Sequence, residues 1–246
     1  MPRYFIEVSY KGTGYSGFQV QKNANSIQAE VEKALLIFYK QRFELTGSSR
    51  TDTGVHALQN YFHFDTDVAL LNDNVYSLNS ILPDDIVIKR VFSVEANAHS
   101  RFDALSREYR YYIFDKKNPF LQDRAYYFPY TLNIELMQKA AVEILKYNDF
   151  TSFSKRNTQV KSFLCNIYES EWIREPGTLV YKIKANRFLR GMVKGLVGTM
   201  LQVGREKISI EEFTGIIQAK DCKKADFSVP SLGLFLYKVE FPDTFK

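Results

Sequence analysis

The sequence predicts an α+β protein made of two similar α/β halves around a largely antiparallel mixed sheet. Each half runs through a strand, then a helix, then further strands. Consecutive strands also follow one another without a helix between them, which is typical of antiparallel pairing. No low-complexity linker interrupts the chain. We therefore place the halves at residues 1–105 and 106–246 and expect them to share a sheet or a broad interface.

The first half is expected to open with a strand over residues 4–10. A helix follows over residues 26–39, because its apolar residues recur at helical spacing and Asn25 or Ser26 can cap its start. The remaining elements expected in this half are strands over residues 43–46, 58–64 and 86–91 and a short helix over residues 75–82.

The second half repeats this order of elements. The pattern predicts a strand over 109–114, a helix over 133–147, a hairpin of 164–173 and 179–183 turned at 175–177, a long helix over 187–203 and a last strand over 234–239. Ser209 and Glu212 form a capping box that opens one more helix.

Composition and charge narrow the class of protein. Of 246 residues, 45% are hydrophobic and 25% are charged, which is typical of a globular chain. The net charge of +5 and the pI of about 9.0 suit a polyanionic partner. No apolar run approaches the roughly 20 residues of a membrane span, and the N-terminus leads directly into a strand pattern, so we expect neither a membrane segment nor a signal peptide.

The cysteines and histidines give no metal-site signature. Cys165 and Cys222 are far apart in the sequence, as are the three histidines. A chain of this size does not need a disulfide, so we expect a reduced cytoplasmic protein without a metal.

Residues 47–57 (GSSRTDTGVHA) are the most informative segment. Strand-like stretches flank this polar turn, and a single carboxylate, Asp52, lies near its tip. Such an element is well placed for chemistry or ligand contact. The alternative is an ordinary connection in which Asp52 hydrogen-bonds only its own turn.

Two short motifs resemble cofactor or protease signatures without their context. Residues 12–17 match G-x-G-x-x-G after a strand, but the polar stretch 19–25 separates the third glycine from the next helix, so no dinucleotide site is expected. Residues 52–54 match the Asp-Thr-Gly of aspartic proteases. That chemistry needs two carboxylates, and this chain has one such triplet, so the protease remains a minor alternative.

The expected helix over residues 187–203 carries a basic stripe. Arg187, Gly191, Lys194 and Gly198 fall on one face at 100° per residue. A solvated face gains nothing from glycines, each of which costs about 0.5–1 kcal/mol relative to alanine. We therefore expect backbone, a ligand or an active-site loop to approach this face closely, although an amphipathic helix with a basic wet face is the simpler alternative.

Five ordered blocks of the chain resemble the TruA family of tRNA pseudouridine synthases. They are residues 10–21 (YKGTGYSGFQVQ), residues 50–57 (RTDTGVHA) with 61–64, residues 101–102 with 107–111, residues 184–194 (KANRFLRGMVK) and residues 233–236 (GLFL). The blocks span nearly the whole chain and keep the family order.

This resemblance implies a function and a fold. The family isomerises uridine to pseudouridine in the anticodon stem-loop of tRNA, at the positions numbered 38 to 40, without cofactor or metal. Its fold joins two α+β halves with a basic cleft between them, and the protein is usually a homodimer. An enzyme acting on a stacked base must extrude it into a pocket.

The resemblance also implies roles for particular residues. Asp52 matches the catalytic aspartate, which can act on the sugar, attack the base or abstract a proton. Arg50 and Lys194 are the candidate cations beside it, and lysine replaces the arginine that is frequent at the second position. Tyr109 matches the active-site tyrosine and Leu234 an apolar pocket residue. The candidate phosphate contacts are Arg101, Arg107, Arg110, Arg187 and Arg190. The alternative is a non-catalytic RNA-binding protein that keeps this fold.

Overall fold

The structure is a computed structural model and describes residues 1–156 and 160–245. The chain divides into two compact units, one made of residues 1–105 and 235–246 and the other of residues 106–234. The C-terminal residues 235–246 therefore lie with the first unit, whereas the sequence boundary assigned them to the second half. Their strand β9 (Leu234–Glu240) pairs in parallel with β3 (His56–Asp65) through Phe235 and Leu236.

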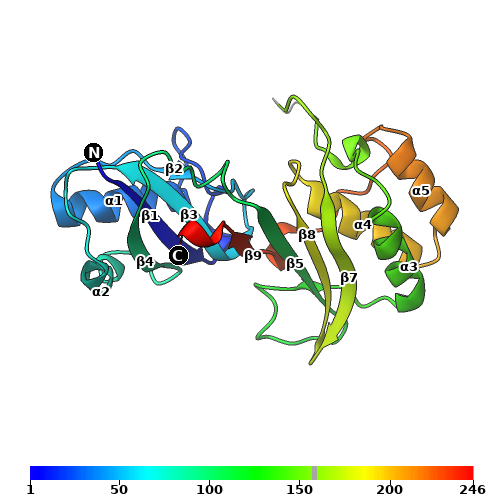
Figure 1. The fold of residues 1–246 in the computed structure, drawn as a ribbon. Helices are drawn as coiled ribbons and strands as arrows, with labels where there is room; N and C mark the ends of the chain where they lie inside the picture. Colours follow the sequence, from blue (N-terminus) through cyan, green and yellow to red (C-terminus); the bar gives the residue numbers. More distant parts are fainter. Residues whose placement is uncertain (157–159, 246) are drawn as a thin grey trace. The chain divides into compact units, whose positions relative to one another are not determined.

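The first unit is a sheet with its helices packed beside it (Figure 1). Strand β1 (Arg3–Tyr10) lies between β4 (Ile86–Val94) and β3, antiparallel to both, and the short β2 (Thr46–Gly47) adds to β3. The helices are α1 (Ile27–Tyr39) and α2 (Val75–Asn79). Ser26 caps α1 by accepting a hydrogen bond from the Ala29 amide at 3.3 Å, which confirms the predicted helix start.

The second unit has an antiparallel sheet in the order β5, β8, β7 (Figure 1). Its strands are β5 (Ser106–Phe114), β7 (Ile167–Glu175) and β8 (Thr178–Ala185), with the two-residue β6 (Tyr126–Tyr127) parallel to β5. The helices are α3 (Ile134–Ile144), α4 (Met192–Gly204) and α5 (Ile210–Gln218). The capping box at Ser209 and Glu212 is formed as predicted. The α+β class with mostly antiparallel strands is confirmed.

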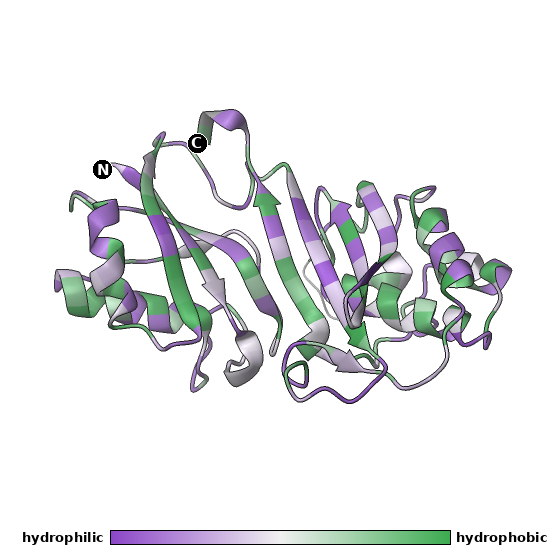
Figure 2. Cartoon of the chain, turned by 90° about the horizontal axis from the view of Figure 1, so that it is seen from below, coloured by the Kyte–Doolittle hydropathy of each residue, from purple (hydrophilic) through white to green (hydrophobic). Residues whose placement is uncertain are grey.

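Hydrophobic and hydrophilic residues alternate along part of the sheet (Figure 2), as expected for strands with one covered face, whereas β1 and β3 are buried along most of their length. In β4, for example, Ile86 and Ile88 are buried and Val87 and Lys89 are exposed, but the alternation ends there, because Arg90 is exposed as well. Helix α4 differs, because eleven of its thirteen residues are buried. It is a core helix of the second unit, packed against α3 and α5.

The long predicted helix was wrong at its N-terminal end. α4 begins at Met192, five residues later than expected, because Gly191 caps it with a positive φ of 76° and the Lys155 amide bonds the Arg190 carbonyl before it. Arg187 therefore lies outside the helix, and the predicted stripe of Arg187, Gly191, Lys194 and Gly198 does not exist as one helical face.

No helix in the described part of the chain is long and apolar enough to cross a membrane. The two cysteines are free thiols. Burial raises the pKa of the Cys165 thiol to about 11, with a minor opposing effect of Arg187. This thiol is therefore protonated and unreactive near neutral pH.

Candidate active site

The Asp52 loop joins β2 to β3 and is held from several sides. Tyr10 and Thr51 share a hydrogen bond of 2.8 Å between their hydroxyls, and Thr51 also accepts one from the Phe18 amide at 3.1 Å. Asn60, fully buried on β3, donates to the Ser49 carbonyl at 2.8 Å. The backbone on either side of Arg50 is therefore fixed by the sheet of the first unit.

Asp52 itself begins a tight turn. Its carbonyl accepts a hydrogen bond from the Val55 amide at 3.1 Å, and Gly54, the third residue of the turn, has a φ of 76°. Glycine adopts this left-handed conformation without strain. The turn leaves the Asp52 side chain partly exposed, while Thr51 and Val55 beside it are buried. A rigid loop thus presents a carboxylate that a substrate can reach.

Two of the three glycines of the G-x-G-x-x-G match, Gly12 and Gly17, pack against this loop. A Cβ on Gly12 would overlap the carbonyl oxygen of Val55, and one on Gly17, whose φ is 110°, would lie 3.0 Å from that of Thr51. Close backbone approach to the Asp52 loop accounts for both residues. From the sequence no dinucleotide site was expected here, and no local pattern indicated this packing.

His56 supports the same loop from β3. Its ring is 1% exposed, stacks on Phe235 at 4.5 Å between centroids, and accepts a hydrogen bond from the Gly12 amide through Nδ1 at 3.2 Å. An accepting Nδ1 requires a neutral ring with its proton on Nε2. His56 therefore serves as a structural residue.

Two of the predicted phosphate-binding arginines of the second unit have protein partners. Arg107 is 9% exposed and donates to the Asn186 carbonyl at 2.9 Å. Arg110 bonds Glu108 at 2.8 Å and lies 3.6 Å from Glu175. These carboxylates compete with any phosphate for Arg110. Arg187, which is partly exposed, and Arg190, which is exposed, lie in the connection between β8 and α4.

Tyr109 lies on β5, opposite Ile183 of β8. Its ring is partly exposed and meets Phe188 edge to face, with 5.0 Å between ring centroids. Phe188 comes from the same connection that carries Arg187. Tyr109 therefore contacts a residue of the block 184–194, one of the five blocks that resemble the TruA family.

Lys194 contacts the turn η4 (Ser231–Gly233), which directly precedes Leu234. The Lys194 Nζ, in the first turn of α4, lies 3.4 Å from the Ser231 hydroxyl, and Leu234 directly follows η4. Tyr111 of β5 anchors this segment by donating to the Pro230 carbonyl at 2.7 Å. Leu234 is 7% exposed, so its pocket-lining role and a core role are both compatible with its position.

Arg50 and Arg101 border one hollow in the first unit, together with Phe102. Phe102 was given no role from the sequence, because an exposed aromatic cannot be told from a core one by its neighbours in the chain. Among the described residues, no group of three or more His, Cys, Asp or Glu side chains is placed to hold a metal ion.

Comparison with known proteins identifies the class. A family model described as tRNA pseudouridine synthase matches residues 140–242. Together with the full-length relatives below, this match shows that the chain belongs to the tRNA pseudouridine synthase family.

The relatives define the branch within that family. A protein of Bacteroides thetaiotaomicron named tRNA pseudouridine synthase A is 44% identical over 99% of this chain and 92% of its own length. Proteins of the same name from Parabacteroides distasonis and Bacillus subtilis are 42% and 38% identical, over 99% and 95% of this chain and 97% of theirs. The family resemblance drawn from the five sequence blocks is confirmed.

Proposed function

We propose that this protein is a tRNA pseudouridine synthase that isomerises uridine to pseudouridine in the anticodon stem-loop, at positions 38 to 40. The observation that carries the proposal is the near-complete alignment with relatives named tRNA pseudouridine synthase A. The anchored Asp52 loop supports it, because the reaction needs a carboxylate in a fixed position.

Asp52 is the catalytic residue in this proposal. The reaction breaks the glycosidic C–N bond, turns the detached base and joins its C5 to the same sugar carbon. The proton on C5 must then leave. A carboxylate can stabilise or trap the sugar while the base is loose, or attack the base, or accept that proton. The partly exposed carboxylate at the turn is compatible with each of these roles.

The other residues bind substrate. Tyr109 stacks on the target base, Arg50 and Lys194 supply positive charge, and Leu234 contributes apolar surface. Arg101, Arg187 and Arg190 bind phosphates. Arg107 and Arg110 bind phosphates as well in this proposal. Each also keeps a partner within the protein, the Asn186 carbonyl for Arg107 and the Glu108 carboxylate for Arg110.

The test is pseudouridine formation on unmodified tRNA by the wild-type protein and by Asp52→Asn. Asparagine keeps the side-chain shape and leaves the Asp52 carbonyl to close the turn. We expect activity to fall by at least a thousandfold, as for loss of a nucleophile or general base. Carbodiimide labelling and primer extension then locate the modified positions. Equal activity in the two proteins would remove Asp52 from catalysis, and inactivity of the wild type would favour a non-catalytic RNA-binding protein.

The proposal includes a cellular setting and an assembly. With tRNA as substrate, the protein acts in the cytoplasm. We also propose a homodimer, following the family resemblance. Sedimentation across a range of concentrations tests this assembly, and a monomer at all concentrations that support activity would refute it.

A further inference from the structure

A small hollow lies beside the Asp52 loop within the first unit. Its volume is about 190 Å³, and its lining includes Phe18, Gln28, Leu45, Arg50, Arg101 and Phe102. Phe18 and Leu45 are buried core residues and contribute the apolar part of the lining. Arg50 lies two residues before Asp52, so one border of the hollow belongs to the loop that carries the proposed catalytic carboxylate. We call it the Arg50–Phe102 hollow.

The rim of this hollow combines cations with an exposed ring. Arg50 and Arg101 are both exposed. Phe102 is 73% exposed, and the guanidinium carbon of Arg101 lies 5.6 Å from the centre of its ring. Aromatic rings beside arginines are how proteins bind unpaired nucleotides, because the ring stacks on the base and the cation meets the phosphate. A largely exposed phenylalanine gains little from the protein itself.

The backbone carrying Phe102 is held in place. The His99 Nδ1 accepts hydrogen bonds from the amides of Arg101 at 3.1 Å and Phe102 at 3.4 Å, and Asp103 accepts one from the His99 amide at 2.7 Å. The rings of His99 and Phe102 lie 4.2 Å apart. This loop is therefore already ordered without RNA, which lowers the entropic cost of binding.

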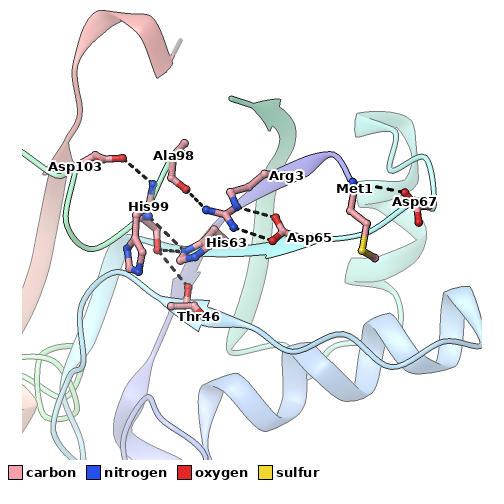
Figure 3. A network of polar contacts seen from close by, with 10 residues as sticks. Met1, Arg3, Thr46, His63, Asp65, Asp67, Ala98, His99 and Asp103 are labelled. Atoms are coloured by element: carbon pink, nitrogen blue, oxygen red, sulfur yellow. Dashed lines mark hydrogen bonds and ion pairs between the residues drawn. The ribbon is translucent and has the colours of Figure 1, made fainter. Parts of the chain in front are cut away.

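A buried polar network ties the same loop to the sheet (Figure 3). The Ser100 hydroxyl lies 2.8 Å from His63 Nδ1 and donates to the Thr46 carbonyl at 3.2 Å. Arg3 of β1 binds the Ala98 carbonyl at 2.8 Å. The base of the loop is thus fixed to β1, β2 and β3, and its tip, with Arg101 and Phe102, is left at the surface.

From this arrangement we infer that the Arg50–Phe102 hollow binds one nucleotide of the tRNA strand that adjoins the target uridine. Its base stacks on Phe102, and its phosphate is held by Arg50 and Arg101. This inference rests on the proposed function, since it takes tRNA as the substrate. It adds Phe102 as a binding residue and His99 as a positioning residue that orients the loop.

The test couples a protein substitution to an RNA substitution. Binding is measured in the Asp52→Asn background, so that the target uridine stays unmodified. Phe102→Leu removes the stacking face, and a series of anticodon stem-loops carries an abasic nucleotide at each position beside the target. We expect Phe102→Leu to weaken binding roughly tenfold. At one position the abasic RNA should weaken the Phe102 protein by a similar factor and leave the Phe102→Leu protein unaffected.

Matched variants separate stacking from general effects. Phe102→Tyr keeps an aromatic face and should bind within about twofold of the parent. Tyr76→Leu removes another exposed aromatic of the first unit, 82% exposed on α2, and should leave affinity unchanged. Equal losses from Phe102→Leu and Tyr76→Leu would overturn the inference.

The phosphate contact has its own readout. Arg101→Ala should reduce the slope of log affinity against log salt by roughly 0.7, the value for one contact to a single strand. Arg42→Ala removes an exposed arginine that does not line the hollow and should leave the slope unchanged. An unchanged slope for Arg101→Ala would show that Arg101 binds no phosphate in the hollow.

Two outcomes would overturn the inference while the proposed function stands. Independent, additive losses at every RNA position would show that no base meets Phe102. A change in oligomeric state on Phe102→Leu, with tRNA affinity unaltered, would assign the hollow to a protein contact. The proposed function is tested separately, because the binding measurements with Asp52→Asn require no turnover. It fails if the wild-type protein forms no pseudouridine.

Discussion

At the scale of single residues, the glycines of one motif have different physical roles. Gly12 and Gly14 lie at the two ends of the same 3₁₀ turn, η1 (Gly12–Gly14). A Cβ on Gly12 would overlap the Val55 carbonyl, whereas a Cβ on Gly14 would meet nothing within 4 Å. Of these two, only Gly12 is required by packing, and what it packs against is the turn that begins at Asp52.

Gly12→Ala should therefore damage both stability and activity. The added methyl group must push the turn away, and overpacking of this kind costs about 1 to 3 kcal/mol. We expect a matching fall in the free energy of unfolding, measured by denaturant titration, and a lower rate of pseudouridine formation. Gly14→Ala is the control, with a change within about 0.5 kcal/mol and normal activity. Indistinguishable behaviour of the two variants would show that the turn accommodates a side chain at residue 12.

At the scale of elements, α4 shows why a glycine can be needed inside a helix. A Cβ on Gly198 would overlap the carbonyl oxygen of Asp226. That residue is held by the Thr199 hydroxyl, which accepts from its amide at 3.0 Å, and by Gln202, which donates to its carboxylate at 2.8 Å. The expectation of close backbone approach to this helix is confirmed for Gly198, although the predicted stripe is not.

Gly198→Ala tests this packing against helix propensity. Alanine favours the helix by up to about 1 kcal/mol, but the overlap with a fixed carbonyl outweighs that gain. We expect net destabilisation of about 1 to 2 kcal/mol by thermal or denaturant unfolding. Gly215→Ala on α5, where a Cβ meets nothing within 4 Å, should instead stabilise by about 0.5 to 1 kcal/mol. Stabilisation by both substitutions would mean that the segment at Asp226 moves freely.

At the scale of the whole molecule, buried histidine makes stability depend on pH. His63 is 6% exposed, and burial, with smaller contributions from His99 and Arg3, lowers its pKa from 6.5 to about 4. Asp65 and Asp103 oppose this shift weakly. Between these pH values the unfolded chain binds a proton that the folded chain does not, so stability falls as pH falls.

The predicted loss from His63 between pH 7.5 and pH 5 is about 2 kcal/mol, at 1.36 kcal/mol per pH unit. Chemical unfolding at several pH values measures it. The pKa values of the Glu7 and Asp65 carboxyls are lowered in the folded protein. The interval from pH 7.5 to pH 5 therefore lies above the range in which these two groups become protonated. His63→Gln should flatten the profile by the same amount. A profile equally steep in the variant would assign the effect to other groups.

Elements with local signals were predicted well from the sequence. Ser26 and Ser209 begin α1 and α5 because their side chains cap amides three residues ahead, an interaction confined to one turn. The turn of the β7–β8 hairpin was predicted correctly, because a proline followed by Gly177 is a local turn signal. In the structure Gly177 has the positive φ, 77°, that glycine favours. By contrast, only Thr46 of the strand expected over residues 43–46 pairs with β3, together with Gly47 after it, since pairing depends on a partner distant in the chain.

By itself, the sequence determined the α+β class, the family and the candidate catalytic aspartate. Caps, periodicities and ordered motifs are local, so they can be read from residues that neighbour one another in the chain. Only the tertiary structure decided where α4 begins, why Gly12 and Gly198 are glycines, which arginines have carboxylate partners, and that Phe102 stands exposed beside Arg50. Each of these depends on contacts between segments far apart in sequence, which no local pattern records.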